Sequence, residues 1–141
     1  MIHFELSVWP FVTVALVNFI LSWLYYSPAA PWFKAWQLGV GVDPAKQTMT
    51  EEETKMMPFL FGGAFLSTLL LSYGLQIVVH SFGATDFRTG ALAGAALWAA
   101  FSVTHSLSTL FEGRKPQVLL INTVLYLVTY AGFGGLIALW N

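Results

Sequence analysis

Hydrophobic residues fill long uninterrupted stretches of this chain, and charged residues fall between those stretches. Four segments, 8–26, 58–80, 90–111 and 119–140, contain no Asp, Glu, Lys or Arg. At about 1.5 Å per helical residue, each segment is long enough to cross a hydrocarbon layer of about 30 Å. The pattern therefore predicts an all-α membrane protein with four transmembrane helices and no β-strand.

The connection between the first two spans contains a pattern of its own. Trp32 and Trp36 are spaced as i and i+4, and Lys34 lies off the stripe that they form. This spacing favours a short helix lying in the membrane interface between helices 1 and 2. The alternative is a loop folded over the end of the bundle.

Two further signals precede the second span. Asp43-Pro44 is typical of a helix start, with proline at the first helical position. Thr50 and Glu53 form a capping-box pattern, which predicts a helix that begins outside the membrane and passes Pro58.

Composition excludes several classes of protein. The chain has 141 residues, of which 57% are hydrophobic and 9% charged, whereas soluble domains carry about 25% charged residues. Four spans leave no room for a separate soluble domain, so we expect one transmembrane domain over residues 1–141. A net charge of −1 without a basic tract argues against nucleic acid as a partner. The absence of cysteine excludes disulfides and thiolate ligands.

The histidines do not predict a metal centre. They are His3, His80 and His105, and the last two are expected in opposite leaflets because their spans run in opposite directions. No Gly-rich phosphate loop follows a predicted strand either. We therefore expect no metal and no cofactor.

Basic residues predict the orientation in the membrane. Five of the six lie in the first and third connections, and Arg88 alone lies in the second. Because basic loops stay in the cytoplasm, we expect a multi-pass protein of the cell (inner) membrane with both termini on the non-cytoplasmic side. The five residues in the cytoplasmic connections are Lys34, Lys46, Lys55, Arg114 and Lys115.

The few polar residues within the spans gather on particular helix faces. Counting about 1.5 Å per residue, His105 lies about 10 Å above Glu112, and Asn18 and Tyr126 reach nearly the same depth. Three helices thus place a polar group at one level, with Asn122 nearer the mouth. The candidate polar cavity consists of Asn18, Ser22, His105, Thr109, Glu112, Asn122 and Tyr126.

Two interpretations of this cluster remain open. The side chains could satisfy one another as a clasp between helices, which is how polar groups commonly join membrane helices. Alternatively, they could line a vestibule in which neutral His105 binds a solute or relays a proton, with Glu112 as the charge at its entrance.

Small residues recur in the third and fourth spans. Gly90 and Gly94 in the third, and Gly134 and Gly135 in the fourth, allow close approach of helices. Such faces serve either packing within the chain or contact with another subunit.

Two stretches of the sequence carry a family resemblance. The first is Tyr25-Tyr26-Ser27-Pro28 followed by Phe33-Lys34-Ala35-Trp36, and the second is Phe111-Glu112-Gly113-Arg114-Lys115-Pro116 followed by Asn122 and Tyr126. In these stretches and in its layout the chain resembles a family of small membrane proteins catalogued as domain of unknown function 1761. The resemblance implies the four-helix fold and places Glu112, Arg114 and Asn122 in a family signature. It implies no activity.

The turn Glu112-Gly113-Arg114 has two interpretations as well. Gly113 can adopt positive φ and end the third span, which would make the turn a structural hairpin with Glu112 paired to Arg114. Alternatively, the turn forms a binding mouth together with Tyr26, Trp36 and Asn122.

Three functional hypotheses follow. The first is a transporter or channel with a polar intramembrane cavity for a small solute, assembled as a homo-oligomer. The second is a non-catalytic membrane subunit or scaffold that packs with itself or with a larger membrane complex through its small-residue faces. The third, an enzyme acting on membrane lipid, would use His105 as a base, and we favour the two non-enzymatic hypotheses.

Overall fold

The computed structural model describes residues 2–46 and 48–140, and this part of the chain is helical without any strand. Four helical stretches are long and apolar enough to cross a membrane. They are α1 (Val8–Tyr25), α3 (Glu51–Ser81), α4 (Phe87–Phe111), and Pro116–Ala138, which consists of α5 (Pro116–Leu127), η1 (Val128–Gly132) and α6 (Phe133–Ala138). The predicted all-α fold and its four spans are confirmed.

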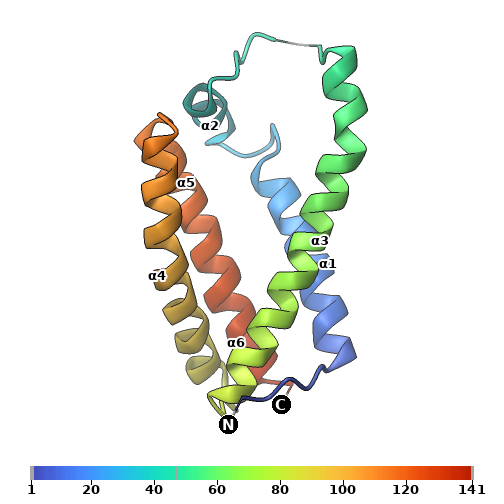
Figure 1. Ribbon diagram of the computed structural model, residues 1–141, viewed down its shortest axis with the longest axis vertical. Helices are drawn as coiled ribbons and strands as arrows, with labels where there is room; N and C mark the ends of the chain where they lie inside the picture. Colours follow the sequence, from blue (N-terminus) through green and yellow to red (C-terminus); the bar gives the residue numbers. More distant parts are fainter. Residues whose placement is uncertain (1, 47, 141) are drawn as a thin grey trace.

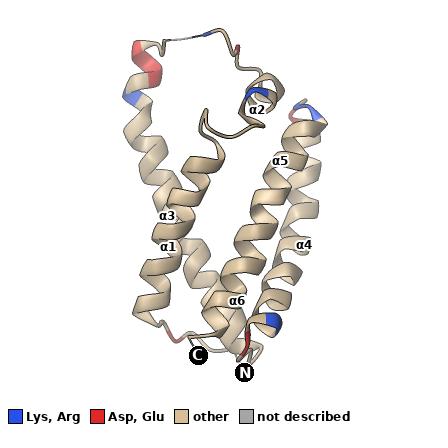
Figure 2. Cartoon of the chain, turned by 180° about the vertical axis from the view of Figure 1, so that it is seen from behind, with Lys and Arg blue, Asp and Glu red and all other residues tan. Residues whose placement is uncertain are grey.

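The short helix α2 (Phe33–Val40) lies at one end of the bundle, and the start of α1 and the end of α6 lie at the other (Figure 1). We call these the α2 end and the terminal end. Charged residues gather at the two ends, and the sides of the long helices carry none (Figure 2). The sides of the bundle therefore present the uncharged surface that acyl chains require.

Local signals account for several helix ends. The Thr50 hydroxyl accepts a hydrogen bond from the Glu53 amide at 3.2 Å, and the Glu53 carboxylate accepts one from the Thr50 amide at 2.7 Å. This capping box is the predicted one, and α3 continues past Pro58. Gly113 has a φ of 71° where α4 ends, as the sequence predicted. The helix start expected at Asp43 is wrong, because its side chain accepts a hydrogen bond from the Ala45 amide at 2.8 Å and closes a turn instead.

The short α2 has features of both predicted alternatives, a short interfacial helix and a segment folded over the end of the bundle. It is a helix, and it lies across the direction of the long helices, where it is seen nearly end-on in Figure 1. It also packs on the start of α5, since the Gln117 side-chain amide donates to the Ala35 carbonyl at 2.9 Å. A methyl group on buried Gly39 would lie only 2.3 Å from a Val118 methyl carbon. These contacts with Gln117 and Val118 hold α2 against the start of α5.

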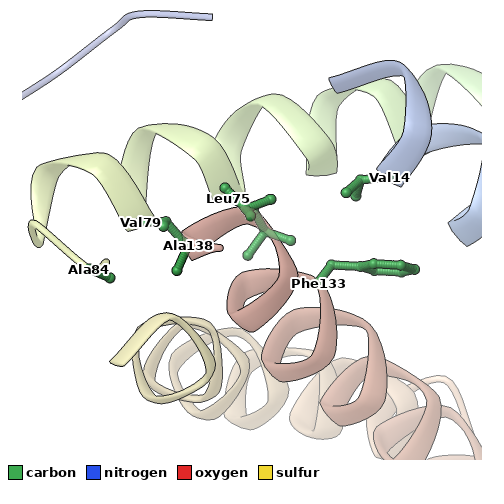
Figure 3. Packing of buried hydrophobic residues seen from close by; sticks show 7 residues of the cluster. Val14, Leu75, Val79, Ala84, Phe133 and Ala138 are labelled. Atoms are coloured by element: carbon green, nitrogen blue, oxygen red, sulfur yellow. The ribbon is translucent and has the colours of Figure 1, made fainter. Parts of the chain in front are cut away.

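The hydrophobic core lies towards the terminal end (Figure 3). There α3 packs against α1 and α6, and α4 packs against α6 and η1. We call this region the closed half. Its buried core residues are Val14, Leu75, Val79, Ala84, Phe133, Ile137 and Ala138.

Glycines bring α4 against the last span in the closed half. A methyl group on Gly90 would lie 2.3 Å from the Gly134 carbonyl oxygen, and one on Gly94 would lie 1.9 Å from the Tyr130 carbonyl oxygen. These contacts require glycine, because the obstructing atoms belong to backbone. Gly90 and Gly94 therefore serve packing within the chain, one of the two predicted roles, and contact with another subunit stays a prediction.

From the turn that joins them at the terminal end, α3 and α4 diverge towards the α2 end (Figure 1). The bundle thereby separates into one pair of helices, α1 with α3, and a second pair, α4 with α5. We call this region the open half.

Candidate functional site

Two cavities lie in the open half, and Tyr126 and Tyr130 line both of them. The first, which we call the His105 cavity, has a volume of about 490 Å³. The second, the Asn18 cavity, has a volume of about 470 Å³ and lies against α1 and α3. The two tyrosines thus form a partition between neighbouring spaces. The His105 cavity is lined by Trp98, Phe101, Ser102, Thr104, His105, Ser108, Tyr126 and Tyr130.

The partition is built at the junction of α5 with the π-helical segment η1. Tyr126 and Tyr130 are spaced as i and i+4, so both side chains project from the same side of this span. Their neighbour Thr129 is buried and points to α1 instead, where its hydroxyl lies 3.3 Å from the Asn18 side-chain oxygen. Short π segments inside α-helices often occur at functional sites.

Hydrogen bonds join α1 to the last span at three levels. In addition to the Thr129–Asn18 contact, the Tyr26 hydroxyl donates to the Asn122 side-chain oxygen at 2.7 Å. The Tyr25 hydroxyl donates to the Ile121 carbonyl at 2.8 Å. These hydrogen bonds form an interhelical clasp between the first and last spans, in which Asn18 and Asn122 pair with residues outside the predicted cluster.

His105 does not take part in that clasp. Its ring packs edge-on against Tyr126, with centroids 5.5 Å apart, and its Nε2 is buried without a hydrogen-bond partner among the described residues. Asn18 lines the other cavity, together with Ser22. The structure thus brings both His105 and Asn18 beside Tyr126, as expected from their depth, but on different sides of the partition.

The remaining α4 candidates lie outside both cavities. The Glu112 carboxylate accepts hydrogen bonds from the Ser108 hydroxyl at 3.1 Å and pairs with Arg114 at 2.9 Å, and both charged side chains are exposed. Thr109 is buried, and its hydroxyl donates to the His105 carbonyl. Glu112 therefore makes the predicted hairpin pair with Arg114 and is hydrogen-bonded to Ser108, which lines the His105 cavity; its role at a cavity entrance stays a prediction.

Aromatic side chains cover the α2 end of the Asn18 cavity. Tyr26, which lines this cavity, packs against Trp36 with ring centroids 5.1 Å apart. Tyr25 packs against Trp32 with centroids 4.5 Å apart, and the Trp32 indole donates to the Tyr25 carbonyl at 2.9 Å. We call Tyr25, Tyr26, Trp32 and Trp36 the aromatic cap. Of the three residues assigned to an interface turn, Tyr26 and Trp36 meet in this cap, whereas Arg114 pairs with Glu112.

Parts of the cavity walls are also exposed molecular surface at membrane depth. Phe101 on α4 lines the His105 cavity and is 59% exposed, and Phe61 on α3 lines the Asn18 cavity and is 42% exposed. Trp23 on α1, also in the Asn18 cavity, is 58% exposed. These residues therefore border a cavity and also form part of the uncharged outer surface of the bundle.

Several residues of the site were missing from the sequence-based candidates. Trp98 is held in the His105 cavity by its indole, which donates to the Thr123 carbonyl at 3.0 Å. Tyr130 and Thr68 were not identified either. Tyr130 lies four residues after Tyr126, so the same helix-face count could have found it, whereas nothing local distinguishes Thr68 from other polar residues of α3.

The lining of the two cavities contains no Asp, Glu, Lys or Arg. Among residues 2–46 and 48–140, no three His, Cys, Asp or Glu side chains converge in a group that could hold a metal ion. The site is thus a neutral aromatic space with a small number of hydroxyl, amide and imidazole groups.

Comparison with known proteins places the chain in a family. Neither the curated proteins nor the solved structures gave a match to it. A family model described as "Protein of unknown function (DUF1761)" matches residues 9–138 and so covers all four spans. The resemblance seen in the two sequence stretches is confirmed, and the chain belongs to the DUF1761 family.

Proposed function

We propose that this protein binds a small uncharged molecule inside the membrane and acts as a carrier for it. The observation that carries the proposal is the pair of aromatic cavities that share Tyr126 and Tyr130. Volumes of about 490 and 470 Å³ lie in the range of small-molecule sites. A few polar groups within apolar walls are also typical of such sites.

The absence of charge in the lining favours a neutral ligand. An ion moved from water into these cavities would lose its hydration and meet no opposite charge among the lining residues. A carrier that exchanges protons for cations would need a carboxylate there, and the nearest candidate, Glu112, is exposed and paired with Arg114. These facts support an uncharged ligand.

The closed half favours a carrier over an open channel. Val14, Leu75 and Ile137 are at most 1% exposed, and they fill the space between α1, α3 and α6. The aromatic cap covers the opposite end of the Asn18 cavity. A ligand would therefore reach the cavities from the lipid side, between α3 and α4.

An enzyme using His105 as a base has weaker support. In nucleophilic catalysis the base accepts a hydrogen bond from the attacking hydroxyl. Here Ser106 and Thr109 donate to backbone carbonyls of their own helix, and Ser108 donates to Glu112. No hydroxyl of the described residues donates to the His105 ring.

The distribution of basic residues supports an orientation for the carrier. Lys34 in α2, Lys55 near the start of α3 and Arg114 after α4 all lie at the α2 end, whereas Arg88 lies at the start of α4, at the terminal end. By the positive-inside rule, the aromatic cap faces the cytoplasm and the terminal end faces away from it.

Photolabelling in lipid nanodiscs tests the proposal. A long-chain alcohol carrying a photoreactive diazirine is incorporated in the bilayer, and labelled residues are mapped by mass spectrometry. We expect labelling of the cavity walls that saturates and is reduced by unlabelled alcohol. Labelling that never saturates and is spread evenly over the lipid-facing side chains would contradict an intramembrane site.

Two neighbouring positions on α4 provide matched variants. Ser102 lines the His105 cavity, whereas Val103, the next residue, is 64% exposed and lines neither cavity. Ser102→Trp should fill the cavity and remove the saturable labelling, and Val103→Trp should leave it unchanged. Equal labelling of the two variants would count against the His105 cavity as the binding site.

A further inference from the structure

The hydroxyls of Tyr126 and Tyr130 differ from the other tyrosine hydroxyls of the open half. Those of Tyr25 and Tyr26 donate to partners on α5. Tyr126 and Tyr130 line both cavities and donate no hydrogen bond to any described residue. Polar groups at membrane depth require partners, so two donors without them indicate a ligand that accepts hydrogen bonds.

The spacing of these donors restricts the shape of that ligand. The two tyrosines are four residues apart in the span, a rise of about 6 Å along its axis at 1.5 Å per residue. Two donors in one site suit a ligand with two separate hydrogen-bond acceptors, such as a ring that carries two carbonyl oxygens. The buried, unpartnered Nε2 of His105 beside Tyr126 adds a third polar group to the same site.

The walls around these donors favour a flat molecule. Phe101 and Tyr130 lie nearly parallel, at an interplanar angle of 27°, and Trp98 lines the same cavity. Aromatic faces of this kind interact well with planar ring systems in offset or edge-on arrangements. The opening towards acyl chains, at exposed Phe101 and Phe61, admits a molecule that is already dissolved in the bilayer.

We propose that the ligand is an uncharged, planar, lipid-soluble dicarbonyl compound with a quinone-like ring, held by hydrogen bonds from Tyr126 and Tyr130. This inference rests on the proposed function and specifies the chemical class of the molecule that the carrier takes. It involves binding only, without any change in the oxidation state of the ring. A lipophilic cation attracted to the aromatic faces is the competing class.

Titration calorimetry on the full chain in phosphatidylcholine nanodiscs tests the class, with heats from empty nanodiscs subtracted. The probes are menadione, which carries two ring carbonyls, methylnaphthalene, which has the same ring system without them, and the cation tetraphenylphosphonium. The variant is Tyr126→Phe combined with Tyr130→Phe. It should fold as the parent does, since both rings remain and neither hydroxyl has a described partner. Tyr73→Phe is the matched control, because Tyr73 lines neither cavity.

We expect saturable binding of menadione that weakens about tenfold in the double variant and is unchanged in Tyr73→Phe, since two hydrogen bonds of ordinary net strength amount to roughly this factor. Methylnaphthalene should bind the parent protein about as weakly as menadione binds the double variant. Equal binding of menadione and methylnaphthalene, or tighter binding of tetraphenylphosphonium than of menadione, would overturn the dicarbonyl class. If saturable photolabelling by the alcohol persisted in either case, the intramembrane carrier itself would stand. Loss of saturable binding for all probes, the alcohol included, would overturn both proposals.

Discussion

The closed half and the open half of the bundle use different residues where helices meet. In the closed half, Gly90 and Gly94 bring the backbone of α4 against the carbonyls of Gly134 and Tyr130. In the open half, bulky aromatic rings such as Trp98 and Tyr126 stand between the helices and leave cavities beside them. One end of the bundle is thus packed through backbone contact, and the other is kept apart by side chains.

Polar groups also differ between the halves in what surrounds them. In the closed half, buried Ser72 donates to the Phe11 carbonyl at 2.9 Å, and the side-chain oxygen of buried Gln76 accepts from the Ser7 amide at 2.9 Å, while Gln76 Nε2 is buried without a described partner. In the open half, Tyr126 and Tyr130 keep their hydroxyls without described partners. Close backbone packing suits a fixed scaffold, whereas free donors in a cavity suit a binding site.

The largest expected effect comes from disturbing the glycine contact between α4 and η1 in the closed half. Gly94→Ala places a methyl group 1.9 Å from the Tyr130 carbonyl oxygen, so α4 must move away from η1. Overpacking of this kind costs about 1–3 kcal/mol. The free energy of unfolding in mixed detergent micelles should decrease accordingly, and ligand binding should weaken because Tyr130 shifts with η1.

Gly62→Ala is the control for this variant. Gly62 also lies inside a long helix, but a methyl group there has no neighbour within 4 Å. Removing the backbone freedom of glycine should stabilise α3 by roughly 0.5–1 kcal/mol. The two substitutions should therefore have opposite signs. The same sign for both would mean that α4 and η1 are not in backbone contact in the membrane.

A smaller effect is expected from removing a hydrogen bond of the interhelical clasp in the open half. Tyr26→Phe removes the hydrogen bond to Asn122 and leaves that amide oxygen without its donor. Hydrogen bonds between membrane helices average about 0.6 kcal/mol and reach about 1.7 kcal/mol. The free energy of unfolding should decrease within this range, measured under the same micelle conditions.

Tyr73→Phe is the reference for the clasp variant. The Tyr73 hydroxyl lies 3.5 Å from the Phe4 carbonyl at the terminal end, which is too long for a strong hydrogen bond. It should leave stability unchanged within error. If Tyr26→Phe had no larger effect than Tyr73→Phe, the clasp would contribute nothing to holding α1 on α5.

The smallest effect concerns the turn at the terminal end. The Asp86 carboxylate caps α4 by accepting hydrogen bonds from the Thr89 amide at 3.0 Å and hydroxyl at 2.9 Å. Two hydrogen bonds lower the pKa of Asp86 below its ordinary value of 3.8. The bond from the Thr89 amide has the larger effect, and the bond from the Thr89 hydroxyl has the second largest. A pKa lowered by folding means that the stabilisation is present above the ordinary value and is lost as the pH falls through the folded value.

The thermal midpoint should therefore decrease slightly on acidification of the parent protein, and this decrease should be smaller in Asp86→Asn, whose amide does not titrate in this range. The cavities lie in the other half, so menadione binding should be the same in the two proteins at neutral pH. An identical acid dependence of the two midpoints would show that capping by Asp86 does not contribute.

Sequence reasoning succeeded where the signal is local. The capping box of Thr50 with Glu53 and the positive φ of Gly113 depend on a few adjacent residues, and both were predicted. Depth along a span is also local, because it follows from helical rise alone, and it brought Asn18 and His105 correctly to the level of Tyr126.

The sequence did not predict which residue of another helix a polar side chain contacts. Thr129 lies on the helix face of Asn122, seven residues earlier, and it contacts Asn18, a pairing that spacing along one helix does not specify. Glu112 pairs with Arg114, as one of the two interpretations of the turn predicted, and also accepts a hydrogen bond from Ser108. A helix face can contact several neighbours, and sequence spacing does not choose among them.

By itself, then, the sequence determined that four uncharged helices cross a membrane, because hydration of the backbone and of charged side chains is lost there and only long uncharged helices tolerate that loss. Only the tertiary structure decided which end of the bundle closes. The reason is that contact between Gly94 and the Tyr130 backbone, and the partition formed by Tyr126 and Tyr130, depend on how two distant helices approach each other. That approach leaves the aromatic cavities beside Tyr126 and Tyr130, and it is the feature on which the proposed function depends.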